Sequence, residues 1–132
     1  MASIEEALFY KLSNTAAITA IVPATKIFYI FLGDSVDLPA ISYQRTSTGR
    51  DHTLTDAQTM AEATFQIDAW SRTNSEMVQL ATEIRNALDG FRGIVDGVTI
   101  ERILQINEFD LPEAEGAIFR RYQSFRIIYQ EP

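Results

Sequence analysis

A run near the middle of the chain alternates apolar and polar side chains from Met60 to Trp70. The apolar set is Ala61, Ala63, Phe65, Ile67 and Ala69, and the polar set is Glu62, Thr64, Gln66 and Asp68. Successive side chains of a strand point to opposite faces, so this period of two predicts a strand with one buried and one hydrated face. The apolar face of such a strand must pack against a second layer of structure.

Three segments are predicted to form helices, and the first and the third have amphipathic spacing. They are Ser3–Leu12, Thr15–Ile21 and a segment that begins at Asn74 or Ser75 and ends at Leu88. Ser3 followed by Glu6 is a capping box, and Thr15 is in position to cap the second helix. Gly90 lies where a left-handed residue commonly ends a helix. Helices of this kind supply the second layer that the sheet requires.

Four further segments are rich in β-branched and aromatic residues and predict strands. They are Lys26–Phe31, Ala40–Arg45, Val98–Ile106 and Ala117–Gln130, and Asp96-Gly97 has the composition of a two-residue hairpin turn. A polar loop over Thr46–Thr59 and an acidic loop over Asn107–Gly116 are expected between them. The sequence therefore predicts an α+β fold, with an antiparallel or mixed sheet and helices packed on one face, in a single domain of residues 1–132.

Composition restricts the function. The net charge of −7 argues against binding nucleic acid by phosphate neutralisation, which needs a basic face. The chain has no Cys, which excludes thiolate chemistry and disulfides. No apolar run has the length of a membrane helix, and we expect a soluble cytoplasmic protein with no membrane partner.

Candidate chemical sites are weak. His52 is the one histidine, and Asp51 and Ser47 near it allow a hydrolase to be considered, but proximity in sequence does not make a triad. The acidic segment after Asn107 lacks the spacing of a calcium loop, and Gly90 to Gly93 lacks that of a phosphate-binding loop. We expect no catalytic residue, no metal site and no cofactor, and thus not an enzyme.

Two groups of residues are candidates for protein–protein contact. Arg120, Tyr122 and Arg126 alternate on one face of the last predicted strand, and Arg and Tyr are enriched at interface hot spots. The second group is Arg50, Asp51 and His52 in the predicted polar loop, because long loops on a folded scaffold commonly carry function.

Four segments together carry a family resemblance. They are L-P-A-I-S-Y-Q-R from Leu38, G-R-D-H-T-L from Gly49, F-Q-I-D-A-W from Phe65 and A-L-D-G-F-R-G from Ala87. In this order they resemble the tail-completion (tail-terminator, tail-to-head joining) proteins of long-tailed phages, and the similarity extends over nearly the whole chain.

The resemblance implies a structural virion protein. Similar proteins form a ring, commonly a hexamer, that caps the head-proximal end of the tail tube and joins it to the head. The implied partners are further copies of the chain, the tail tube protein and a head-side connector or stopper protein, and DNA passes through the lumen without specific binding. The implied location is the virion, after assembly in the host cytoplasm.

Two alternatives remain open. One is a different connector adaptor or minor tail protein, which the residues alone do not separate from a terminator. The other is a small ligand-binding or enzymatic α+β domain, which would need a deep pocket that holds carboxylates such as Asp68 or Glu101.

Overall fold

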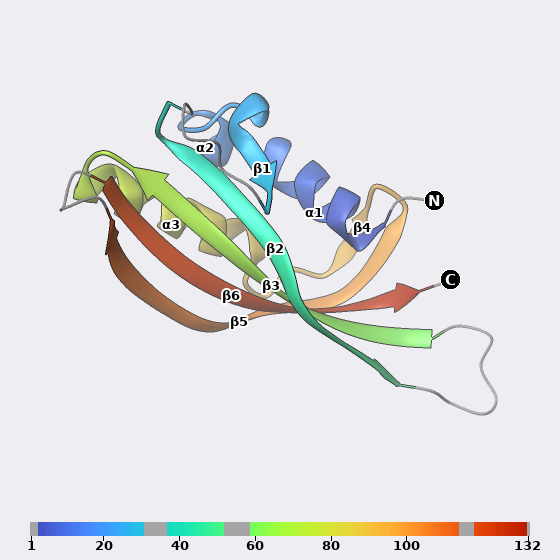
Figure 1. Cartoon of the computed structure of the whole chain (residues 1–132). Helices are drawn as coiled ribbons and strands as arrows, with labels where there is room; N and C mark the ends of the chain where they lie inside the picture. Colours follow the sequence, from blue (N-terminus) through green and yellow to red (C-terminus); the bar gives the residue numbers. More distant parts are fainter. Residues whose placement is uncertain (1–2, 31–36, 52–58, 114–117, 132) are drawn as a thin grey trace.

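Six strands form one mixed sheet in a computed structural model that describes residues 3–30, 37–51, 59–113 and 118–131. The elements in chain order are α1 (Ile4–Ser13), α2 (Ala16–Thr19), a 3-10 turn (Ala24–Lys26), β1 (Ile27–Tyr29), β2 (Ala40–Asp51), β3 (Thr59–Ser71), α3 (Asn74–Leu88), β4 (Gly93–Val95), β5 (Val98–Glu113) and β6 (Ile118–Glu131). The strand order across the sheet is β1-β2-β3-β6-β5-β4 (Figure 1). Strand β1 runs parallel to β2, and every other neighbouring pair is antiparallel.

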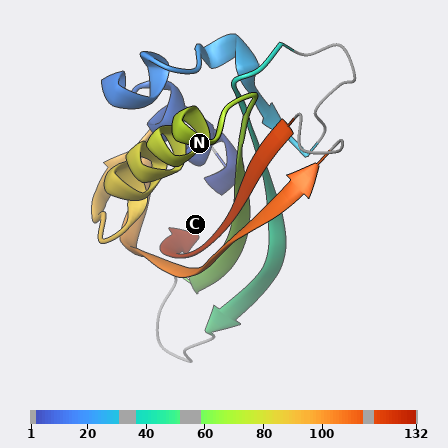
Figure 2. The ribbon, with the colours of Figure 1, turned by 90° about the vertical axis from the view of Figure 1, so that its left-hand side faces the viewer.

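The helices α1, α2 and α3 lie on one side of the sheet, as a view turned by 90° shows (Figure 2). Helix α3 buries the stripe Met77, Leu80, Ala81, Ile84 and Leu88 against it. Phe65 of β3 and Phe125 of β6 lie opposite each other and are fully buried beneath this layer. Each such side chain contributes roughly 1.5–3 kcal/mol to folding. The predicted α+β class and the predicted apolar face of β3 are both confirmed.

Two predicted helix signals are confirmed at atomic detail. In the capping box of α1, the Glu6 N–H donates to Ser3 Oγ (3.1 Å) and the Ser3 N–H donates to Glu6 Oε1 (3.2 Å). Gly90 has φ of +82°, and its N–H donates to the Ile103 carbonyl oxygen (2.7 Å). The end of α3 is thereby tied to β5.

Two other helix predictions were wrong in detail. The N-cap of α3 is Thr73, whose hydroxyl accepts from the Glu76 N–H (3.3 Å), and not Asn74 or Ser75. Thr15 precedes α2, but its hydroxyl donates to the Lys11 carbonyl oxygen (2.7 Å) and caps nothing. Helix α2 is also shorter than predicted. A hydroxyl can satisfy several nearby backbone groups, and sequence does not say which one it takes.

The polar loop predicted over 46–59 was wrong at residues 46–51 and at residue 59, which belong to strands. Strand β2 continues to Asp51 and β3 begins at Thr59, with Gly49 opposite Glu62 and a bulge between Arg45 and Ser47. The predicted acidic loop was also wrong over 107–113, where β5 pairs with β6. The remainder of both predicted loops lies outside the described residues. These polar segments adopt strand conformation because their backbone pairs with a neighbouring strand. The local composition of a segment does not reveal such pairing.

The predicted hairpin turn is confirmed. Asp96 and Gly97 both have positive φ, of +49° and +82°, as a two-residue turn of this type requires. Strand β1 is shorter than predicted, because residues 24–26 form the 3-10 turn and Ile30 takes a left-handed conformation with φ of +69°.

Candidate functional site

The face of the sheet opposite the helices is the first candidate site. Two rows of side chains cross it from β3 through β6 to β5. Trp70, Arg120 and Leu111 form one row, and Asp68, Tyr122 and Phe109 form the next. We call these six residues the aromatic–arginine cluster.

An ion pair anchors this cluster. The Arg120 Nη2 lies 2.8 Å from Asp68 Oδ2, and Asp68 also accepts from Gln66 Nε2 (3.1 Å) and from Ser42 Oγ (3.4 Å). Asp68 is only 4% exposed, so its prediction as a hydrated residue was wrong. It does lie on the face that the alternation assigns to it, but the long side chains around it cover the carboxylate.

Aromatic rings hold Arg120 in place. Its guanidinium carbon lies 4.1 Å from the ring centroids of both Trp70 and Tyr122. The centroid of the Tyr122 ring is 4.9 Å from that of the Phe109 ring. The Phe109 side chain is 43% exposed and the Leu111 side chain is 37% exposed. An ordered guanidinium between two rings, bordered by exposed apolar side chains, has the composition of a protein–protein contact surface.

Arg120, Tyr122 and Arg126 do share one face of β6, as their spacing predicts. Arg126 Nε lies 2.7 Å from Glu62 Oε1, and both of these side chains are more than 40% exposed. Arg121, which lies between them in sequence, points to the opposite face. Its Nε donates to Asp110 Oδ1 (2.6 Å), and this bond raises the pKa of the guanidinium.

Two of the three predicted contact residues near the end of β2, Arg50 and Asp51, lie in the described part of the chain. Arg50 makes a two-pronged ion pair with Glu131, at 2.6 Å and 3.1 Å, where β2, β3 and β6 extend past the helix layer (Figure 1). This pair raises the pKa of Arg50 and lowers that of Glu131. Asp51 is the last residue of β2, opposite Met60, and His52 lies outside the described residues.

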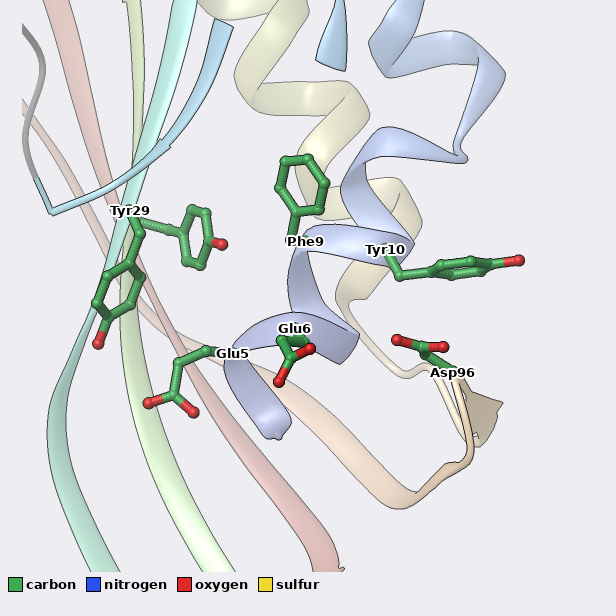
Figure 3. A pocket seen from close by; sticks show the side chains of 7 residues that line it. Glu5, Glu6, Phe9, Tyr10, Tyr29 and Asp96 are labelled. Atoms are coloured by element: carbon green, nitrogen blue, oxygen red, sulfur yellow. The ribbon is translucent and has the colours of Figure 1, made fainter. Parts of the chain in front are cut away.

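A groove of about 390 Å³ on the helix side is the second candidate site, and sequence reasoning missed it (Figure 3). Its lining comes from α1, from the edge strands β1 and β2, and from the β4–β5 turn: Glu5, Glu6, Phe9, Tyr10, Tyr29, Tyr43 and Asp96. Burial raises the pKa of Tyr43 to about 12, helped by the neighbouring Tyr29 and Glu5. Only the acidic first turn of α1 hinted at this groove in the sequence, since its other walls are distant along the chain.

The described residues bear on three further features: metal sites, membrane-spanning helices and the carboxylate of Glu101. Residues 3–30, 37–51, 59–113 and 118–131 contain no group of three or more His, Asp or Glu that could hold a metal ion. Within the same ranges, no helix has the length and apolarity to cross a membrane. Glu101 accepts from Gln130 Nε2 (2.6 Å) and lies 3.9 Å from Arg92, in a surface network and not in a pocket with Asp68.

Comparison with known proteins decides the family. The model of the tail completion protein gp17 family matches residues 6–130. The chain belongs to this tail completion family. A chain in the virion of a native gene transfer agent particle has a similar fold, with a TM-score of 0.76 at 13% sequence identity, over 98% of this chain and 96% of that one. No curated protein matches the sequence.

Family membership confirms the resemblance carried by the four sequence segments. As a member of the tail completion family, the chain is a structural tail protein.

Proposed function

We propose that this tail completion protein caps the head-proximal end of the tail tube as a ring and joins the tail to the head connector. The observation that carries the proposal is the family match, which spans residues 6–130. The partners are then further copies of the chain, the tail tube protein and a connector or stopper protein on the head side.

The edges of the sheet support assembly into a ring. Strand β1 pairs only with residues 41–43 of β2, and β4 pairs only with residues 98–100 of β5. Most of β2 and β5 therefore has no outer neighbour among the described strands. Open edges attract further strands, and two different open edges on one subunit allow a head-to-tail contact that closes into a ring.

In this proposal, the residues predicted from the sequence to make protein–protein contacts still do so. Arg120 and Tyr122 belong to the aromatic–arginine cluster, and Arg126 lies further along the same face. Arg50 and Asp51 lie at the end of β2 that extends beyond the helices, and His52 follows them in the sequence. Replacing Arg50 and Asp51 by Ala should spare the fold and abolish joining; unimpaired joining would remove them from the mechanism.

The charge of the chain fits a passage for DNA. Each copy carries a net charge of −7, so a ring of copies is strongly acidic. An acidic lumen repels phosphates and lets DNA slide without specific contacts. A lumen wall lined by Arg and Lys in the assembled ring would contradict this part of the proposal.

Electron microscopy of particles made without this gene tests the function. Filled heads beside unattached, over-long tails are the expected result, because an uncapped tube continues to grow and has no surface for the head. Normal particles would contradict the proposal. Empty or leaking heads would instead indicate an adaptor on the head side of the joint.

A further inference from the structure

The groove in Figure 3 combines aromatic rings with carboxylates. Tyr29 and Glu5 lie toward one end and Tyr10 and Asp96 toward the other, with Glu6 between them. None of the residues that line it is basic. Tyr10 and Tyr29 are 48% and 42% exposed, so their rings are available to a ligand.

The carboxylates of the groove differ in whether they already have a hydrogen-bond or ion-pair partner. Glu5 accepts from Arg45 (2.7 Å), and Glu6 is held by the capping box. Asp96 makes no hydrogen bond or ion pair within the described part of the chain. The lining of the groove therefore carries uncompensated negative charge at Asp96, beside the carboxylates of Glu5 and Glu6.

We propose that this groove binds the basic side chain of an extended segment from a partner protein. The faces of tyrosine rings attract a guanidinium or ammonium group, and carboxylates at the rim pair with it. A cavity of about 390 Å³ is large enough for one long side chain and its adjoining backbone. Arginine fits best, because its flat guanidinium stacks on a ring while it donates to a carboxylate.

The charge and the surroundings of the groove select a protein as the occupant. A lining with carboxylates and no basic residue is unfavourable for the phosphates of a nucleic acid or of an anionic membrane. The exposed rings of Tyr10 and Tyr29 offer apolar contact to the methylene groups of a bound basic side chain. The groove lies on the helix side of the sheet, opposite the aromatic–arginine cluster. A partner bound here would leave that cluster open.

A titration of the isolated, isotope-labelled chain by nuclear magnetic resonance tests the proposal. The probe is a short capped peptide, Gly-Ile-Arg-Ile-Gly, and its control carries citrulline, which has the shape of arginine without the charge. We expect saturable shifts of the Tyr10 and Tyr29 ring signals and of the Asp96 amide. The citrulline peptide should bind about fivefold more weakly, since a cation over an aromatic ring contributes about 1 kcal/mol.

Matched variants locate the binding. Asp96→Asn removes the unpaired charge, and Asn tolerates the left-handed conformation of this turn. It should weaken the arginine peptide about fivefold, whereas Glu83→Gln on α3 should leave binding unchanged. Tyr10→Leu keeps apolar area but removes an aromatic face, and it should also weaken binding.

Three results would overturn the proposal: equal binding of the two peptides, no saturable shift, or full binding by Asp96→Asn. The melting temperature of each variant shows whether it is folded. Because no particle enters this experiment, its failure would leave the proposed function intact, and the reverse also holds.

Discussion

At the scale of single residues, the ion pair of Asp68 and Arg120 gives the first prediction, a loss of stability when the arginine is removed. Asp68 is 4% exposed, so removing its partner leaves a buried carboxylate without its countercharge. We expect Arg120→Ala to lower the free energy of unfolding by about 3 kcal/mol. The control is Arg126→Ala, whose partner Glu62 is half-exposed and which should cost less than 1 kcal/mol.

Urea unfolding of the two variants measures this difference. Adding Asp68→Asn to Arg120→Ala should recover part of the loss, because the neutral amide is cheaper to bury. Equal and small costs for both arginines would show that the carboxylate is solvated.

Tyr43 gives the second residue-scale prediction, a loss of stability in alkali. Its pKa is raised from about 10 to about 12 in the folded protein, first by burial. The stability that this provides is complete below pH 10, the unfolded value, and is lost as the pH rises toward 12. The loss should reach roughly 2–3 kcal/mol.

Unfolding experiments at pH 9 and pH 11.5 would detect it. Tyr43→Phe should remove this part of the pH dependence, whereas Tyr10→Phe, at a half-exposed ring, should leave it in place. An unchanged pH dependence in Tyr43→Phe would assign the alkaline loss to other groups.

At the scale of elements, the β4–β5 turn depends on its glycine. Gly97 has φ of +82°, a conformation that strains any residue with a Cβ, although open space surrounds the position. Gly97→Ala should therefore cost at least about 1 kcal/mol.

Gly49 in β2 is the matched control. A Cβ built there meets nothing within 4 Å and its φ is not in the left-handed region, so Gly49→Ala should be neutral or stabilise by up to about 1 kcal/mol. Thermal melts of both variants measure the contrast. A comparable loss at both positions would mean that the strain is not specific to the turn.

At the scale of the whole molecule, the proposed assembly predicts which exposed apolar residues matter. Phe109 and Leu111 lie in the aromatic–arginine cluster, whereas Ile94 on β4 is 72% exposed outside it. Phe109→Ser with Leu111→Ser should leave the fold intact and reduce joined particles at least about tenfold, because apolar anchors dominate contact energy.

Counts of joined particles in a complementation experiment measure this effect. Ile94→Ser should complement fully. If the double variant also complements fully, the bare face of the sheet is not an assembly surface.

Local patterns predicted the parts of the fold whose physics is local. The alternation around Phe65 identified β3 and its buried face, Ser3 and Glu6 identified the start of α1, and Asp96-Gly97 identified a hairpin. The same reasoning placed Arg120, Tyr122 and Arg126 together on one face of β6. Each of these depends on residues a few positions apart, whose geometry follows from the backbone period.

Only the tertiary structure decided the rest. Polar residues of β2 and β5 lie in strands because neighbouring strands supply their backbone hydrogen bonds. Asp68 is buried because Arg120, 52 residues away in the sequence, covers it. The groove needs α1, β1, β2 and the β4–β5 turn at once. The sequence by itself determined the periods, caps and turns, since these are short-range; burial, pairing and cavities came from contacts between distant segments, which only the folded chain brings together.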